Sequence, residues 1–132
     1  MKQPSWNGLI PGVSTIHDAV KLLGQPSSTG DFVNGKSYDF VEGYVRITIL
    51  RSQEVISKIR LSRPSGNQPT IVPSDLLELT SVYGEINVIG VKPGEGLQLE
   101  APGIRALADP SSQPEKVIWL EIFQCQEYGS DV

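Results

Sequence analysis

One set of helix signals occurs twice in this chain, at a constant offset of sixty residues. Each set has an N-cap residue, an acidic residue three positions later and a glycine stop; the sets are Thr15, Asp18 and Gly24, then Asp75, Glu78 and Gly84. A cap and an acid at this spacing satisfy the first free N–H groups of a helix, and a glycine commonly ends one. The spacing therefore predicts two short helices, each opening one copy of a tandem repeat.

The apolar residues between these signals also match. They follow an i, i+3, i+6, i+7 spacing, at Ile16, Ala19, Leu22 and Leu23 in the first copy and at Leu76, Leu79, Val82 and Tyr83 in the second. Residues at this spacing share one side of a helix. Each helix is therefore predicted to bury one apolar side.

Three runs with apolar residues at every second position follow each helix, a pattern that marks half-buried strands. In the first copy the runs contain Tyr38 and Phe40, then residues 44–50, then 55–61; in the second they contain Leu97 and Leu99, then 104–108, then 117–123. Gly30 and Gly90 occupy matching connectors before the first runs. The pattern predicts three antiparallel strands in each copy.

A helix with three strands is too small to bury both kinds of element, so two such units are expected to share one core. The predicted fold class is therefore α+β: two tandem helix–β–β–β units forming a joined antiparallel sheet, with the helices packed on one face. Residues 1–132 are predicted to form a single domain made of two repeats. The repeats span 8–63 and 70–124, with a linker at 64–69 and a flexible tail at 125–132.

The two parts of the chain carry opposite charge within a total of −4. Residues 1–66 hold eight Lys or Arg and five acids, a net +3, whereas residues 67–132 hold three Lys or Arg and ten acids, a net −7. This asymmetry is typical of a charge-complementary contact, and equally of a solvated surface whose composition has drifted. The acidic total argues against nucleic acid as a partner, because phosphates would be repelled.

The sequence offers little material for catalysis or for a cofactor. Cys125 and His17 are its single cysteine and single histidine, so an intramolecular disulfide and a thiolate metal cluster are excluded. We expect no catalytic residues, no cofactor and no metal. No apolar run is long enough to cross a membrane. The compartment stays open: a leader before Met1 would place the chain in the cell envelope, and without one it is cytoplasmic.

Alternation in the strands predicts which side chains point away from the core. In the first copy the outward set is Tyr44, Arg46, Lys58 and Arg60, a basic patch beside an aromatic ring. In the second copy Ile118, Leu120 and Ile122 are expected inward, which leaves Val117, Trp119, Glu121 and Phe123 outward. Exposed aromatic side chains are enriched at interfaces. A covering of this face by the N-terminal arm, through Trp6, or by the tail is the alternative.

The stretch Gly8-Leu9-Ile10-Pro11-Gly12-Val13-Ser14-Thr15, followed by residues 18–26, resembles the opening motif of the BamE (SmpA/OmlA) lipoproteins. In that family a Pro-Gly-x-Ser-Thr turn starts a helix that ends in Leu-Leu-Gly-x-Pro before a small antiparallel sheet. The tandem arrangement is similar to the β-lactamase-inhibitor-protein fold, which joins two such units. The resemblance implies a protein that binds other proteins through its loops and exposed sheet face and has no active site.

The leading hypothesis is a non-enzymatic protein–protein interaction module, such as an envelope assembly component or an inhibitor or immunity-type protein. Its partner would contact the sheet face and the loops at 31–36, 51–54 and 109–115. The predicted partner-binding residues are Tyr44, Arg46, Lys58, Arg60, Trp119, Glu121 and Phe123. The alternative is a small-ligand-binding or enzymatic protein that uses a cleft between the repeats. Self-association through the same face is a third possibility.

Overall fold

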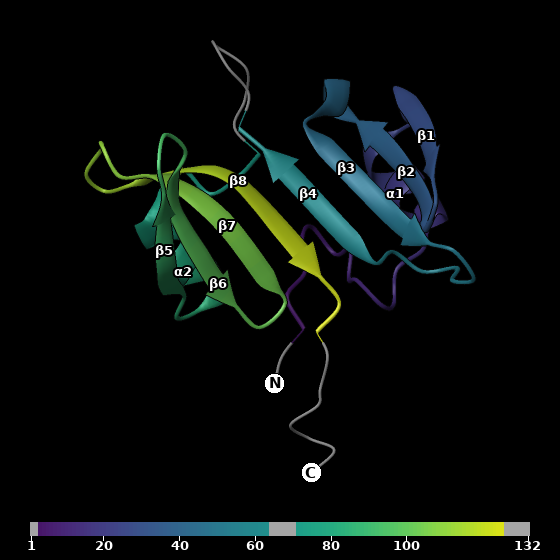
Figure 1. Cartoon of the computed structure of the whole chain (residues 1–132). Helices are drawn as coiled ribbons and strands as arrows, with labels where there is room; N and C mark the ends of the chain where they lie inside the picture. The colour runs from purple at the N-terminus through teal and green to yellow at the C-terminus, as the bar shows by residue number, and fades with distance from the viewer. Residues whose placement is uncertain (1–2, 64–70, 126–132) are drawn as a thin grey trace.

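A computed structural model describes residues 3–63 and 71–125 of the chain. Eight strands form one antiparallel sheet in the order β1-β2-β3-β4-β8-β7-β6-β5 (Figure 1). The first four are β1 (Ser28–Phe32), β2 (Gly35–Phe40), β3 (Val45–Leu50) and β4 (Lys58–Ser62). The others are β5 (Asn87–Lys92), β6 (Gly96–Ala101), β7 (Ile104–Asp109) and β8 (Lys116–Phe123). The helices are α1 (Ile16–Leu23) and α2 (Leu76–Tyr83), and a 3-10 turn, η1, spans Val41–Gly43.

The predicted α+β class, with helices packed on one face of the sheet, is wrong. Of the described residues, 46% lie in strands or bridges and only 16% in helices. Each helix has eight residues and only one of them is buried, Ala19 in α1 and Leu79 in α2. Leu22 and Val82, expected on the buried side, are 46% and 61% exposed. The sheet is therefore the body of the molecule.

Each half of the chain has four strands rather than the predicted three. The sequence prediction missed the two edge strands, because they carry no alternating pattern. Every residue of β1 is exposed. In β5 a bulge between Val88 and Gly90 interrupts the register with β6, so the period of two is lost. The predicted runs lie in the other six strands, although β4 begins only at Lys58.

The order helix and then four strands occurs twice, once in residues 3–63, the N-terminal half, and once in residues 71–125, the C-terminal half. The halves meet in the middle of the sheet, where β4 and β8 run side by side (Figure 1). Across this joint Leu61 lies opposite Leu120 and Ile59 opposite Ile122, and all four side chains are completely buried. Both halves therefore contribute to one core. The predicted linker, and the predicted tail beyond Cys125, lie outside the described residues.

Backbone details are also shared between the halves. The strands β2 and β6 each begin at a glycine that lies against the neighbouring strand. A Cβ on Gly35 would collide with the carbonyl oxygen of Ile49, and one on Gly96 would collide with that of Ala108. Any larger residue at these positions would push the first hydrogen-bonded pair apart.

Candidate binding face

One face of the sheet carries the polar side chains of its central strands and is here called the open face. On β3, Val45 and Ile47 are completely buried and Arg46 between them is exposed. On β4, Ile59 and Leu61 are completely buried, whereas Lys58 and Arg60 are half-buried. Successive side chains of a strand point to opposite sides, so these three cations lie on the side away from the core.

Six charged residues lie directly opposite one another across six neighbouring strands of this face. This charged row runs through β2, β3, β4, β8, β7 and β6 and consists of Asp39, Arg46, Arg60, Glu121, Arg105 and Glu100. Directly opposite side chains in a sheet are close enough to interact. The row therefore links the two halves electrostatically on the open face.

Glu121 is the centre of the charged row. Its side chain is only 8% exposed, and its Oε2 lies 2.8 Å from Arg60 Nη1 and 3.5 Å from Lys58 Nζ. Its Oε1 lies 3.8 Å from Arg105 Nη1. A nearly buried charge is costly unless it is paired, and these three cations pair it. The exposed parts of the cations lie above it, so this part of the surface is positively charged.

Two aromatic rings hold the arginines in place. The Arg60 guanidinium lies 4.4 Å from the centroid of the Trp119 ring, and that of Arg105 lies 5.6 Å from Phe123. Cation–π contact adds to the ion pair, so Arg60 is fixed both by Trp119 and by Glu121. A side chain fixed before binding loses little entropy when a partner docks.

At the N-terminal end of the charged row, Arg46 and Asp39 form a two-contact ion pair. Arg46 Nε donates to Asp39 Oδ1 at 2.8 Å, and Nη2 donates to Oδ2 at 3.3 Å. This bond holds the pKa of the Asp39 carboxyl below its usual value and raises the pKa of Arg46. Both groups are therefore charged at neutral pH.

The open face is hollowed over each half. The larger hollow, here called the N-terminal groove, has a volume of about 790 Å³ and lies over β1 to β4. Its floor holds Arg46, Lys58 and Arg60, and Phe32 and Leu50 also line it. A smaller hollow of about 260 Å³ lies over β5 to β8, beside Trp119.

Six of the seven predicted partner-binding residues lie on strands at the open face, and Tyr44 does not. Tyr44 closes the η1 turn before β3 begins. The outward position expected for Val117 is also wrong. A bulge in β8 shifts the register, so that Trp119 pairs with Leu107 and Val117 pairs with Ala108. Val117 is therefore completely buried.

Sequence reasoning missed Asp39, Arg105 and Glu100 as members of the face. Arg105 is flanked by the buried Ile104 and Ala106, a local alternation that does mark it as outward. Its membership in one row with Arg60 depends on the pairing of β4 with β8, and no local pattern shows that pairing.

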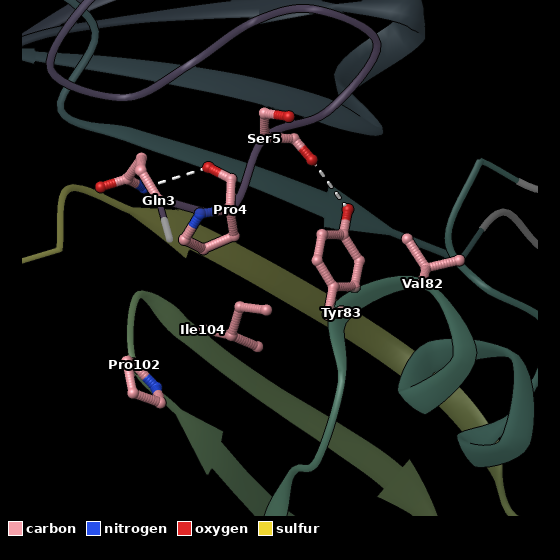
Figure 2. A pocket seen from close by; sticks show the side chains of 7 residues that line it. All are labelled: Gln3, Pro4, Ser5, Val82, Tyr83, Pro102 and Ile104. Carbon is pink, nitrogen blue, oxygen red and sulfur yellow. Dashed lines mark hydrogen bonds between the residues drawn. The ribbon is translucent and has the colours of Figure 1, made fainter. Parts of the chain in front are cut away.

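The N-terminal arm, described from Gln3 on, packs elsewhere than on Trp119. Trp6 packs against the buried core. Gln3 Nε2 donates to the Phe123 carbonyl at 2.9 Å, and the Cys125 N–H donates to Gln3 Oε1 at 2.5 Å. Gln3, Pro4 and Ser5 of the arm line a small hollow of about 190 Å³. There the Tyr83 hydroxyl donates to the Ser5 carbonyl at 3.1 Å, the contact drawn between these residues in Figure 2. The arm therefore lies along the end of β8 and beside α2.

The residues considered for chemistry lie apart from the open face. His17 is exposed on α1, and Cys125 follows β8 and is half-buried. Within the described ranges, no three His, Cys, Asp or Glu side chains are grouped so that they could hold a metal ion. Neither described helix is long and apolar enough to cross a membrane. The chain matches no protein-family model, no curated protein and no solved structure.

Proposed function

We propose that this chain is a non-enzymatic protein-binding module whose open face receives a partner. The observation that carries the proposal is the cluster at the centre of the face, where Arg60 is held between Trp119 and Glu121. Arginine and tryptophan are the residue types that most often dominate binding energy at protein interfaces. The cluster has hollows on both sides, which suits a partner with protruding side chains.

The size of the face is consistent with this function. Eight strands spaced about 4.8 Å apart span about 34 Å, and strands of five or six residues are about 17–20 Å long. The face therefore measures on the order of 600 Å², while a standard interface buries about 800 Å² on each partner. We expect the connections between strands at 33–34, 51–54 and 110–115 to supply the remainder; the loop predicted at 31–36 is wrong, since most of those residues lie in β1 and β2.

The resemblance to the BamE-like and β-lactamase-inhibitor-protein-like families supports the same proposal, because proteins of that architecture mostly bind other proteins. In this chain the motif forms the start of α1. The Ile10 N–H donates to Ser14 Oγ at 2.8 Å, and Thr15 and Asp18 cap the helix reciprocally. The motif therefore supports the proposal through fold alone.

The proposal can be tested by comparing Trp119→Ala with Val82→Ala, an exposed substitution on α2. Partners captured by the wild type are identified, purified and titrated by calorimetry against both variants, after circular dichroism has shown that each is folded. We expect Trp119→Ala to weaken binding by tenfold or more, since central interface residues contribute about 2 kcal/mol or more. Val82→Ala should bind as the wild type does. A partner that tolerates Trp119→Ala and is lost with Val82→Ala would contradict the proposal.

A further inference from the structure

The charged row alternates in sign except at one place. Asp39 pairs with Arg46, Arg60 with Glu121, and Arg105 with both Glu121 and Glu100. Between β3 and β4, however, Arg46 lies directly opposite Arg60. Within residues 3–63 and 71–125, no carboxylate bridges these two arginines. Lys58, two positions before Arg60, adds a third positive charge. We call these three residues the positive gap.

Like charges placed directly opposite in a sheet are destabilising, so this arrangement works against the stability of the fold. In the C-terminal half, the corresponding arginine has no like charge opposite it. Arg105 has carboxylates on both sides, Glu100 at 3.7 Å and Glu121 at 3.8 Å. Arg46 and Arg105 are almost equally exposed, at 53% and 54%. The difference between them is therefore the missing negative neighbour.

We propose that a carboxylate from an acidic segment of the partner protein occupies the positive gap and completes the alternation of the row. This inference rests on the proposed protein-binding function and names the chemistry of the partner. Each guanidinium has five N–H donors, and the described residues accept two from Arg46 and one from Arg60. Donors thus remain for an aspartate or glutamate, and ion pairs of this geometry are the strong ones.

The N-terminal groove indicates what accompanies the carboxylate. The positive gap lies in its floor, and the carboxylates Asp31 and Glu121 also line it, so its charged lining is three cations against two acids. The hydroxyl residues Ser37, Thr48 and Ser57 line it as well. Phe32 and Leu50 line it as well, and they are 41% and 39% exposed. A segment with an apolar residue next to its acid would cover these two side chains while its carboxylate contacts the cations. Arg60 is already fixed by Trp119 and Glu121, so the site is largely formed before binding.

The probe for this inference is a blocked peptide of sequence Gly-Leu-Glu-Leu-Gly, with Gly-Leu-Gln-Leu-Gly as its uncharged match. Nuclear magnetic resonance of the arginine Nε–H groups reports each guanidinium separately, even when binding is weak. We expect the acidic peptide to shift the signals of Arg46 and Arg60 saturably. The glutamine peptide should bind at least about tenfold more weakly, because it lacks the charge.

Three variants make the test specific to the positive gap. Arg46→Gln should weaken acidic-peptide binding about tenfold, because it removes one side of the gap without touching the nearly buried Glu121. Arg105→Gln removes an arginine of equal exposure whose neighbours are already negative, and should weaken binding less than about twofold. Lys21→Gln, on α1, should change nothing.

Four results would overturn the inference. The first two are equal losses of peptide affinity with Arg46→Gln and Arg105→Gln, and equal affinity for the two peptides. The third is a saturable shift of the arginine signals with inorganic phosphate alone. The fourth is a shift of the two arginine signals when the protein alone is diluted, which would identify a second copy as the occupant. The proposed function fails separately. A partner that needs Trp119 but tolerates Arg46→Gln would contradict the binding of an acidic segment in the positive gap, while the proposed protein-binding function of the open face would still hold.

Discussion

Each half of the sheet places an arginine at the same point of its third strand, Arg46 on β3 and Arg105 on β7, and surrounds it differently. Arg105 lies between two glutamates, whereas Arg46 lies between Asp39 and another arginine. The difference comes from one pair of facing residues at the joint, since β4 supplies Arg60 where β8 supplies Glu121.

Two halves with the same order of elements can therefore differ in the charge of their surfaces. The facing pair joins them by opposite charges, which two identical strands could not do. The same pair leaves the C-terminal half electrostatically satisfied and the N-terminal half with an excess of positive charge on its open face. One pair of facing residues at a joint can therefore both link two halves and distinguish their surfaces.

The largest expected effect tests whether the two halves unfold together. Leu61→Ala and Leu120→Ala each remove a completely buried side chain at the joint, and each should lower the free energy of unfolding by about 2–5 kcal/mol. Trp119 reports the C-terminal half, and a Tyr38→Trp substitution on β2, at a side chain packed against the core, reports the N-terminal half. In variants that keep one tryptophan, urea denaturation should give coincident curves.

The control for this experiment is Leu77→Ala, at a position that is 68% exposed, where the loss should stay below about 0.5 kcal/mol. Separate transitions at the two tryptophans would mean that the halves unfold independently, and the shared core would then not be cooperative.

The next effect concerns the facing charges at the joint. Arg60→Glu places a second carboxylate beside the nearly buried Glu121 and should cost about 2 kcal/mol, because the pair becomes repulsive. Adding Glu121→Arg to the same chain should recover much of that loss. A double-mutant cycle in urea measures the coupling, and additive losses would show that the two side chains do not interact in solution.

The exchanged chain also sharpens the comparison between the halves. In the row, two positive side chains would then be neighbours between β7 and β8 instead of between β3 and β4. Acidic-peptide binding should become sensitive to Arg105→Gln and lose its sensitivity to Arg46→Gln.

A smaller effect concerns the caps of the two helices, which differ in detail. In α1, Thr15 and Asp18 cap each other, with the Thr15 N–H donating to Asp18 Oδ2 at 2.9 Å. In α2, Asp75 accepts from the Glu78 N–H at 2.9 Å, but Glu78 itself accepts from Ser74 instead. Thr15→Ala and Asp75→Ala should each cost about 1 kcal/mol and lower Tm by about 4 °C.

Thermal denaturation followed by circular dichroism measures these losses. Thr80→Ala is the control, since its hydroxyl donates to the Leu77 carbonyl within the same helix and caps neither end. A loss with Thr80→Ala as large as with the two cap variants would contradict a role for the caps.

The smallest effect is the dependence of stability on pH through Asp39. Its pKa is lowered by Arg46 in the folded chain, so its contribution is present above the ordinary value of 3.8 and is lost as the pH falls through the lowered pKa. Asp39→Asn should therefore lose less stability than the wild type between pH 5 and pH 2. The difference should stay below about 1 kcal/mol, because Arg46 is largely exposed. Parallel stability curves for the two proteins would show that the ion pair does not form in solution.

Sequence patterns predicted the parts of the fold where one side of a strand is buried. Arg46 lies between two completely buried residues, and so does Arg60, so both could be assigned to the open face. The edge strands could not be predicted, because their residues have no buried side to produce an alternation. The fold class was wrong for a different reason, because the apolar spacing of the helices overstated their burial. Only Ala19 in α1 and Leu79 in α2 are buried.

The candidate site was predictable only in pieces. Local alternation gave Arg60 and Trp119 their outward positions, but one bulge in β8 was enough to turn Val117 into the core. The ion pair between Arg60 and Glu121 joins residues that are 61 positions apart. Only the three-dimensional register of β4 against β8 shows that the signs alternate across six strands, and that they fail to alternate once.

The contact between Gln3 and the end of β8 has a consequence for the connectivity of the chain. It brings Gln3, the first described residue, beside Cys125, the last one. A short peptide joining the ends could close the backbone into a ring, and the ring could be reopened between residues 63 and 71. Such a circular permutant would start with the acidic half and finish with the basic one, while every strand keeps its neighbours.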